Sequence, residues 1–423
     1  MKIEFPYPWA EPVEVPDDRL LGVFSPREVE EREPEAAVIE RALAHPIGPA
    51  SPIPDAVRPG DRVLILIDDN TRVTRADAVL PTLLREFHRA GVRDESIEIL
   101  VALGTHRPMT EDEILAKVGP DIFGRYRIIN HDAHDLSALV QLEDTQLGTE
   151  VWVNRRLSEA DYVIGLGQIV PHRVAGYSGG SKIIQPGVSG EVTTGQTHWA
   201  SAQFSGAEIL GVADNPVRRE MDAVARRAGL TAIFNVIQDA RKRIIGAVFG
   251  DPVAAHRAGC EVSFDVYGVR MPRLADIVLI DSYPADVDMW QAGKGIYSSE
   301  LAVRQGGVVI LVTPCPEGVS PTHPQVLEFG YRGYEEVRVL VESGVITDLT
   351  VAAHLVHVGR VTADRATCII VSPGITEDMA RGLHLRHANS AQNALREAFA
   401  QVGSGAEVAV LKHGGDILAI GGE

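Results

Sequence analysis

Cysteine is scarce in this chain, and its scarcity excludes two kinds of structural support. The 423 residues include three cysteines, Cys260, Cys315 and Cys368, which are odd in number and far apart. Such spacing supports neither a disulfide framework nor a cysteine-based metal site. We therefore expect three buried thiols in a reducing compartment, with the cytoplasm as the location.

Long apolar runs and clusters of positive charge are also missing. No segment approaches the roughly 20 apolar residues of a membrane span, and the opening MKIEFPYPWAEP lacks the pattern of a signal peptide. Forty lysines and arginines stand against 58 aspartates and glutamates, which gives a net charge of −18. We therefore expect neither a nucleic acid nor a membrane as partner. A few buried cations can still define a local site for an anionic substrate.

What the chain does contain is a regular alternation of apolar runs and helical patterns. Continuous aliphatic runs occur at 62–68, 97–104, 161–169, 275–282, 307–314 and 366–374. Strands that are apolar on both faces and joined by helices are typical of a parallel sheet covered on both sides. Because the chain is too long for one ordinary core, the sequence predicts an α/β fold of two domains, each with a mainly parallel sheet flanked by helices.

The alternation breaks in the middle of the chain and places the expected domain boundary. Two β-rich runs flank QDARKR within residues 231–250 and predict a hairpin. We place an N-terminal domain at 1–268 and a C-terminal domain at 269–402. The tail 403–423 is predicted to form a final strand pair that packs back on the N-terminal domain. Thr110 and Glu113 have the spacing of a capping box and predict a helix start.

Polar and charged residues gather directly after the expected strands. DDNTR (68–72), GTHRPMT (104–110), PHRVAGYSGGSK (171–182) and DSYPADVDMWQAGKG (281–295) all lie in such positions. Ligands of open parallel sheets bind beyond the carboxyl ends of the strands. Four loops from two domains therefore predict one active site in an interdomain cleft.

The glycine-rich loop before Lys182 leaves several interpretations open. It lacks the spacing of a P-loop, but the amides of Gly179, Gly180 and Ser181 could form an anion nest. Lys182 itself could anchor a carbonyl-type cofactor covalently. A surface turn with a solvated lysine is the structural alternative.

Three histidines, His106, His172 and His198, fall in these loops. Each alone could be a packing residue, but three in one cleft favour proton transfer near neutral pH or coordination of nickel, copper or zinc. Arg72 and Lys294 are cations suited to a carboxylate, with surface ion pairs as the alternative.

Three further groups of polar residues are less telling. Of the neighbours Asp68 and Asp69, we expect one to cap and one to contact the ligand. We expect HDAHD (131–135) to be structural, and HLVH (354–357) to be structural unless it lines the pocket.

Taken together, these motifs resemble the nickel-pincer lactate racemase family, the nickel-dependent 2-hydroxyacid racemases and epimerases. The resemblance spans nearly the whole chain and is carried, in order, by DDNTR, GTHRPMT, PHRVAGYSGGSKIIQPG, THW and SYPADVDMWQAGKG. His172 lies ten residues before Lys182 and His198 sixteen after it, as in the family pattern.

The resemblance implies a cofactor and a role for each residue. Lys182 would carry the nickel-pincer cofactor, pyridinium-3-thioamide-5-thiocarboxylic acid mononucleotide, through a thioamide, and His198 would complete the square plane of nickel. It implies the acid–base pair His106 and His172. It also implies two sets of binding residues: for the cofactor, Asp69, Ser178, Gly179 and Gly180; for the substrate, Arg72, Trp290, Gln291 and Lys294. The implied reaction inverts C2 of a small 2-hydroxy acid by transient hydride transfer, and cofactor-biosynthesis enzymes are the implied maturation partners.

The sequence departs from the lactate-specific members of that family at the substrate tail. Those members carry an aromatic residue where this chain has none between residues 345 and 365, and His354 falls near that place. Trp290 stands where a lactate enzyme has tyrosine. We therefore predict a non-aromatic acid, with lactate and short aliphatic acids first and sugar acids second. The alternatives are a histidine-ligated metal hydrolase, a pyridoxal-phosphate enzyme and a non-catalytic nickel or cofactor carrier.

Overall fold

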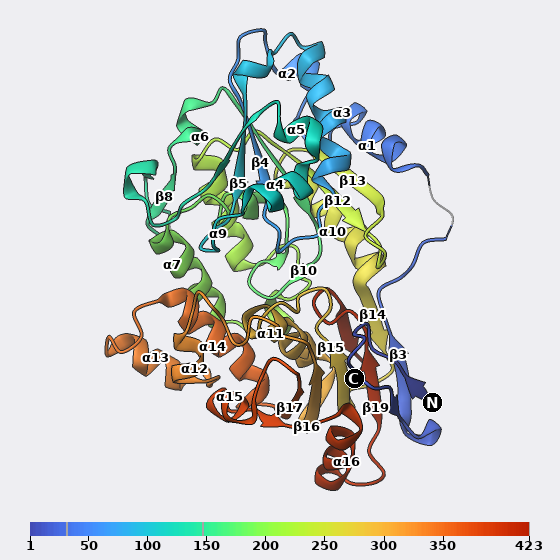
Figure 1. Ribbon diagram of the computed structural model, residues 1–423. Helices are drawn as coiled ribbons and strands as arrows, with labels where there is room; N and C mark the ends of the chain where they lie inside the picture. Colours follow the sequence, from blue (N-terminus) through green and yellow to red (C-terminus); the bar gives the residue numbers. More distant parts are fainter. Residues whose placement is uncertain (31–32, 146–147, 423) are drawn as a thin grey trace.

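Two α/β bodies, one above the other, make up the chain (Figure 1). The computed structural model describes residues 1–30, 33–145 and 148–422. Each body contains a six-stranded sheet with helices against its faces. The predicted two-domain α/β fold is thus confirmed. No helix in the described part of the chain combines the length and apolar character needed to cross a membrane.

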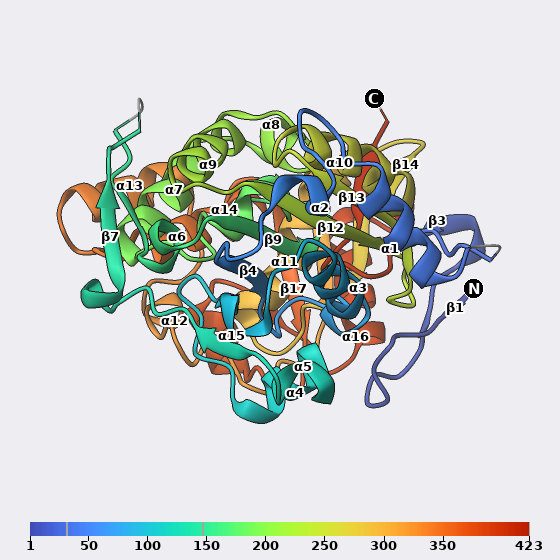
Figure 2. The same ribbon diagram turned by 90° about the horizontal axis from the view of Figure 1, so that it is seen from above.

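The first sheet has the strand order β13-β12-β9-β4-β5-β6 and is parallel apart from one hairpin. Its strands are β4 (Val63–Asp68), β5 (Ile97–Ala102), β6 (Arg127–Asn130), β9 (Tyr162–Gln168), β12 (Ala232–Gln238) and β13 (Ile244–Gly250). The predicted hairpin at 231–250 is the antiparallel pair β12–β13. Helices α9 (Pro216–Arg227) and α10 (Ala254–Tyr267) cover one face, and α1 (Glu35–Ala44) and α3 (Ala76–Arg89) the other (Figure 2).

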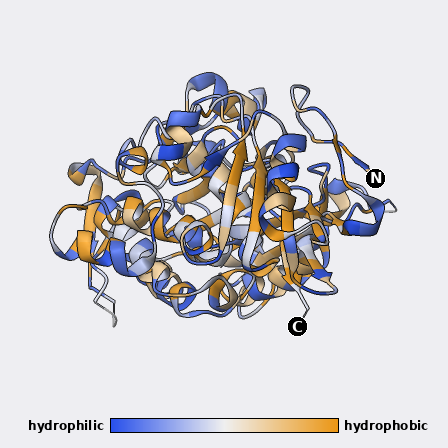
Figure 3. Ribbon diagram, turned by 90° about the horizontal axis from the view of Figure 1, so that it is seen from below, coloured by the Kyte–Doolittle hydropathy of each residue, from blue (hydrophilic) through white to orange (hydrophobic). Residues whose placement is uncertain are grey.

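The second sheet is parallel throughout, with the order β18-β17-β16-β15-β19-β3. Its strands are β3 (Leu20–Phe24), β15 (Ala275–Asp281), β16 (Val303–Val312), β17 (Ala366–Val371), β18 (Arg386–His387) and β19 (Val408–Leu411). Helices α11 (Met289–Ser298) and α14 (Leu349–Thr362) pack on one face, and α16 (Ala391–Val402) on the other. The strands form a hydrophobic band between more polar helices (Figure 3).

Two expectations about the chain ends were wrong. The N-terminal strand β3 pairs with β19 in the second sheet, so residues 20–24 belong to that domain and not to the first. The tail belongs mainly to the second domain, because β19 lies inside the second sheet, although Asp416 and Leu418 also lie against the first domain. Its last strand, β20 (Leu418–Gly421), pairs with β14 (Gly268–Met271) and not with β19. Strand pairing is non-local, so a local pattern does not reveal which sheet a terminal strand joins.

The remaining elements are short or connect the two layers. Thr110 caps α4 (Glu111–Val118) through the predicted capping box with Glu113. Helix α7 (Glu191–Ala202) reaches down to α14, where Arg360 Nη2 donates to the Ala202 carbonyl at 2.8 Å. The other elements are β1 (Lys2–Ile3), β2 (Val13–Glu14), α2 (Ile53–Ala56), α5 (Pro120–Phe123), β7 (Leu139–Leu142), β8 (Val151–Asn154), α6 (Arg156–Glu159), β10 (Pro171–His172), β11 (Gly176–Tyr177), α8 (Gly206–Ile209), α12 (Gln325–Phe329), α13 (Tyr334–Glu342) and α15 (Glu377–Gly382).

Candidate functional site

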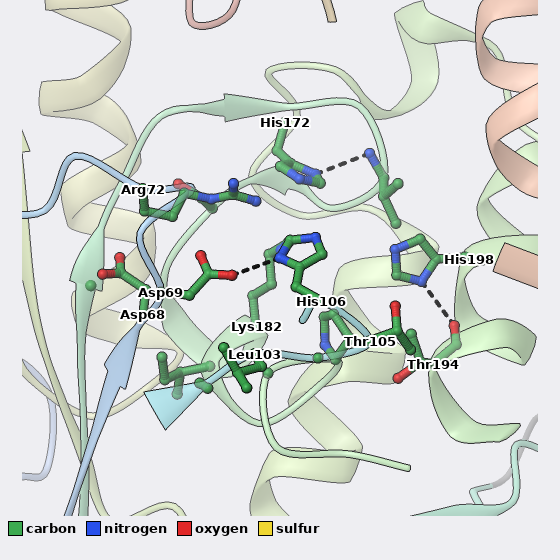
Figure 4. A pocket seen from close by; sticks show the side chains of 18 of the residues that line it. Asp68, Asp69, Arg72, Leu103, Thr105, His106, His172, Lys182, Thr194 and His198 are labelled. Carbon is green, nitrogen blue, oxygen red and sulfur yellow. Dashed lines mark hydrogen bonds and ion pairs between the residues drawn. The ribbon is translucent and has the colours of Figure 1, made fainter. Parts of the chain in front are cut away.

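A cavity lies between the two domains, at the carboxyl ends of β4, β5 and β9. It collects nearly all the site residues expected from the sequence: Asp69, Arg72, His106, His172, Ser178, Gly179, Lys182, His198, Trp290, Gln291 and Lys294. Gly180 is not among its lining residues. Figure 4 shows the rings of His106 and His172 turned toward one space, with Arg72 on one side of it and His198 on the other.

Asp69 orients His106. The Nδ1–H of His106 donates to Asp69 Oδ2 at 2.6 Å, and Asp69 Oδ1 accepts from the Thr71 amide at 3.1 Å. Burial acts to raise the pKa of Asp69, but the charge and hydrogen bond of His106 and the charge of Arg72 outweigh it, so the pKa lies below its usual range. With Nδ1–H committed to a carboxylate, the Nε2 of a neutral His106 carries a lone pair and can act as a base.

Asp68 has a different role from its neighbour. Lys117, a buried residue of α4 that sequence analysis missed, lies 2.7 Å from Asp68 Oδ1. The Lys117 ammonium also donates to the carbonyls of Asp69 at 3.0 Å and Arg72 at 2.9 Å. Asp68 and Lys117 therefore hold the DDNTR loop, and Asp69 is the aspartate that bonds to His106. The expected cap is thus replaced by an ion pair, and the expected ligand contact of the other aspartate stays a prediction.

His172 has the opposite ring arrangement to His106. It lies on β10, which pairs with β11, and its Nδ1 accepts a hydrogen bond from the Val174 amide at 3.2 Å. A neutral His172 therefore carries its proton on Nε2. Burial, followed by the charges of Lys182, Arg72 and Lys294, holds the pKa of His172 well below its usual range.

Positive charge dominates the cavity. Burial first, and then the charge of Arg72, lowers the pKa of both lysines: that of Lys182 falls well below its usual range, and that of Lys294 falls to about 7. Arg72 keeps its guanidinium in place through Thr71, whose hydroxyl accepts at 2.9 Å. Such a site is suited to an anion, and it favours the neutral amine of Lys182 more than an exposed position would.

His198 presents one ring nitrogen to the cavity. Its Nδ1–H donates to the Thr194 carbonyl of the same helix at 2.8 Å, so Nε2 is free to bind a metal. Burial lowers the pKa of His198 to about 4, which keeps the ring neutral. In the described part of the chain, no three histidine, cysteine or carboxylate side chains group as a metal site. Any metal here would need most of its ligands from a bound molecule.

The glycine loop is only partly available for an anion. Gly179 and Gly180 have φ of 73° and 59°, which glycine adopts without strain. The Gly180 amide donates to Asn235 Oδ1 at 2.7 Å, so this donor of the expected nest is already used. Asn235 itself lines the cavity and was missed from the sequence.

The HLVH segment lines the cavity through His354 and His357. We had expected it to be structural unless it lined the pocket, and the structure shows that it does line it. His354 and His357 are buried on α14. The Trp290 ring stacks between His323 and His354, with centroid separations of 4.2 and 4.1 Å. HDAHD is structural as expected, since His131 is buried and bonds to the Ser189 carbonyl at 2.9 Å.

Two more residues, Tyr297 and Asp416, lie near the cations Arg72 and Lys294 and were not predicted from the sequence. Tyr297 lines the cavity one helical turn after Lys294, so helical periodicity along α11 was a usable signal for it. Asp416, from the chain's last loop, lines an adjoining small pocket with Arg72 and Lys294. Burial raises the pKa of Asp416 to about 6, against the opposing charges of Lys294 and Arg72. Nothing near Asp416 in the sequence points to this place.

The cavity between the two α/β domains thus gathers Arg72, Lys294 and the oppositely arranged rings of His106 and His172. The chain matches the lactate racemase N-terminal domain over residues 10–209 and the lactate racemase C-terminal domain over residues 271–419. It therefore belongs to the lactate racemase family, and it is an isomerase. The family resemblance drawn from the sequence motifs is confirmed.

Similar proteins support this assignment over most of the chain. A lactate racemase of Lactiplantibacillus plantarum is 30% identical over 396 residues, 90% of each chain. One from Thermoanaerobacterium thermosaccharolyticum is 30% identical over 322 residues, 75% of each chain. The structure of the lactate racemase apoprotein from the latter organism has a TM-score of 0.88 and 26% identity, covering 99% of this chain and 100% of that one. A Thermotoga maritima protein shares the fold, with a TM-score of 0.74 and 22% identity over 91% of this chain and 98% of that one.

Proposed function

We propose that this protein inverts C2 of a small, non-aromatic 2-hydroxy acid with a nickel-pincer nucleotide bound covalently to Lys182. The observation that carries the proposal is the single cavity in which Lys182, His198 and the pair His106 and His172 meet. Relatives that are 30% identical are named lactate racemases, which supports the reaction class.

The residues present fit the proposed cofactor. A lysine amine of lowered pKa is suited to form a covalent bond at moderate pH. His198 offers one neutral imidazole nitrogen, and one imidazole beside soft sulfur donors is a reasonable square-planar environment for nickel. When bound, the cofactor would supply a group that takes a hydride from C2 and returns it. Loading it would require the cofactor-biosynthesis enzymes as partners.

Arg72, Lys294 and Gln291 would hold the substrate. The guanidinium of Arg72 and the ammonium of Lys294 can grip the substrate carboxylate from two elements, the β4 loop and α11. Gln291 lines the cavity near the start of α11, where its backbone N–H donates to Asp288 Oδ1 at 2.8 Å. Fixing the carboxylate in this way would orient C2 and its hydroxyl toward the histidines.

His106 and His172 would move the hydroxyl proton. His106 Nε2, with its lone pair, would take the hydroxyl proton as the substrate becomes a planar 2-keto acid, and the imidazolium so formed would return that proton to the oxygen. The neutral His172 would donate a hydrogen bond from Nε2–H during this step, and it would act as the base for the opposite enantiomer when its proton is on Nδ1. In the opposite direction the two histidines would exchange roles. Asp69 would stabilise the positive charge that His106 acquires.

The alternatives account for fewer of these features. A histidine-ligated hydrolase needs about three protein ligands on its metal, and the described residues contain no such cluster. A pyridoxal-phosphate enzyme would leave His198, with its free Nε2, without a role. A carrier of nickel or cofactor would have no use for a carboxylate clamp.

The Trp290 stack supports the prediction of a non-aromatic substrate. Three rings, His323, Trp290 and His354, are already packed face to face beside the cavity. An aromatic tail would have to displace this packing, whereas a short or hydroxylated tail would not. A single methylene changes binding by only about 1–3 kcal/mol, so discrimination among short acids is expected to be modest.

Single enantiomers incubated with the cofactor-loaded protein and analysed by chiral chromatography test the proposal. We expect inversion of lactate and other short aliphatic acids first, gluconate epimerisation second and poor conversion of phenyllactate. No inversion of any 2-hydroxy acid would contradict the proposed function. If phenyllactate proved the best substrate, only the prediction of a non-aromatic substrate would be contradicted.

A further inference from the structure

Arg218 is a fully buried cation behind the active site. It lies on α9, with 0% of its surface exposed, and is not part of the cavity lining. Its guanidinium donates to the carbonyls of Ala175 at 3.2 Å, Gly179 at 3.0 Å and Tyr177. Burying a guanidinium is costly unless its donors are satisfied. In the described residues these donors are spent on the backbone of one loop.

The same loop is held by two more buried side chains. His256 Nε2–H donates to the Ser178 carbonyl at 2.9 Å, and Asn235 Oδ1 accepts from the Gly180 amide at 2.7 Å. We call Arg218, His256 and Asn235 the backbone clamp. A Cβ on Gly179 would lie 2.7 Å from Asn235 Oδ1, and one on Gly180 would lie 2.7 Å from the His256 ring. The glycines therefore allow the clamp to approach the backbone directly.

The clamped residues connect two functional side chains. On one side, β11 pairs with β10, where His172 lies opposite Gly176. On the other side, Gly179 precedes the short 3-10 helix Gly180–Ile183, which carries Lys182. The carbonyls that Arg218 holds thus lie between the two residues along the chain.

We propose that Arg218 is a positioning residue for Lys182, which it acts on by fixing the carbonyls of Ala175, Tyr177 and Gly179 and so the direction of the loop. Its charge has a second effect, because after burial and Arg72 it contributes to the lowered pKa of Lys182. The inference rests on the proposed function only for the use made of Lys182. The titratable and charged groups that share the cavity with the amine are Asp68, Asp69, Arg72, His106, His172, Arg173, His198, Lys294, Tyr297, His354 and His357.

Acetylation of the apoprotein by acetic anhydride tests the effect of Arg218 on the Lys182 amine, and it does not need the cofactor. The neutral amine attacks an anhydride carbonyl, acetate leaves, and the amine proton passes to the buffer. The rate at Lys182 is followed against pH by peptide mass spectrometry, with exposed Lys2 as internal reference. The variants are Arg218→Met and Arg218→Lys. Arg219→Met is the matched control, because Arg219 is the next residue of α9 and its side chain is 66% exposed.

In the wild type we expect the midpoint of the Lys182 rate profile to lie well below that of Lys2. Arg218→Met should move it toward that of Lys2 and reduce cofactor loading by about 10–100-fold, as loss of an orienting group commonly does. Arg218→Lys keeps the charge but not the geometry with which arginine reaches the three carbonyls. We therefore expect its acetylation midpoint and its cofactor loading to lie between those of Arg218→Met and the wild type. Arg219→Met should change neither.

The proposal would be overturned if folded Arg218→Met had the same midpoint of the Lys182 acetylation profile as the wild type and the same cofactor loading. If Arg218→Met does not fold, a wild-type profile and wild-type loading in Arg218→Lys would overturn it equally, because the compact ammonium of lysine lacks the planar fork with which arginine reaches the three carbonyls. Circular dichroism establishes folding in each case. If no variant or wild-type protein carries an adduct on Lys182, the proposed function fails, while the acetylation profiles still decide the role of Arg218.

Discussion

At the scale of single residues, the 2.6 Å contact between Asp69 and His106 joins the loops after the neighbouring strands β4 and β5. It leaves Nε2 as the nitrogen of His106 that is available in the cavity. A carboxylate accepts and never donates when ionised, so it holds Nδ1 in the protonated form. The buried position and lowered pKa of Asp69 keep it ionised at neutral pH.

Asp69→Asn is therefore expected to impair catalysis without disrupting the cavity. An amide can donate to Nδ1 and place the ring proton on Nε2, where His106 no longer serves as a base. We expect the turnover rate to fall by about 10²–10⁴-fold, the usual contribution of a general base. Chiral chromatography of the cofactor-loaded variant measures the rate. An unchanged rate would show that Asp69 does not control the base function of His106.

The pKa of about 7 for Lys294 predicts that substrate binding depends on pH. Lys294 is charged below that value and neutral above it, so its grip on a carboxylate weakens as pH rises. We expect KM to increase between about pH 6 and about pH 9, the range in which arginine does not titrate. Lys294→Arg should abolish the increase. A rise of the same size in both proteins would assign the dependence to another group.

Sequence analysis recovered the residues at strand ends and missed those held by tertiary contacts. Arg72, His106 and Lys294 could be predicted because polar residues after buried strands meet at one edge of a sheet. Lys117 and Asp416 could not, because each reaches the site from an element whose position depends on the whole fold. Helical spacing would have revealed Tyr297.

At the scale of elements, the glycine loop is shaped by close approach as well as by φ. Gly180 has φ of 59°, and its Cβ would meet the His256 ring at 2.7 Å. Gly229, after α9, has φ of 80° with nothing within 4 Å of the same atom. The two glycines thus separate the cost of φ from the cost of crowding.

Gly180→Ala and Gly229→Ala should differ in stability for this reason. Gly229→Ala carries only the conformational cost of about 1–2 kcal/mol. Gly180→Ala adds overpacking against His256, for a total of about 2–5 kcal/mol. Urea midpoints of the first unfolding transition measure both, and equal midpoints would show that the loop yields to the added methyl group.

Elements with strong local signals were predictable, and elements defined by distant partners were not. The β12–β13 hairpin and the capping box of α4 depend on neighbouring residues and were confirmed. The clamped strands β10 and β11 are two residues each and exist through the fold around them. The tail strands were recognised as strands but assigned to the wrong partners.

At the scale of the whole molecule, the first residues of the chain complete the second domain. Val13 and Tyr7 are buried in the core between the second sheet and α16, and β3 extends that sheet beside β19. The chain therefore begins and ends in the same domain, and the first domain is inserted between (Figure 1).

A pair of valine substitutions tests this arrangement. Val13 is 0% exposed and Val23 is 39% exposed. Val13→Asp buries an unpaired charge and should destabilise the second domain by about 3–5 kcal/mol. Val23→Asp should change stability by no more than about 0.5 kcal/mol. Limited proteolysis locates the first cleavages, and cleavage of Val13→Asp within the first domain would contradict the assignment.

Under the proposed function, cofactor attachment and nickel retention are expected to depend on two different residues. Lys182 lies on the clamped loop and His198 on α7. His198→Ala should keep the covalent adduct, because Lys182 is intact, and retain less nickel. Metal analysis together with intact mass separates these outcomes, and undiminished nickel would count against His198 as a ligand.

The central claim is that Lys182 carries the cofactor on which racemisation depends. Intact mass and nickel content of protein produced together with the cofactor-biosynthesis enzymes test it most directly, for the wild type and for Lys182→Arg. We predict one cofactor adduct that maps to Lys182, bound nickel and racemisation in the wild type, and none of the three in folded Lys182→Arg. A Lys182→Arg protein that retains the adduct and inverts its substrate would contradict the account.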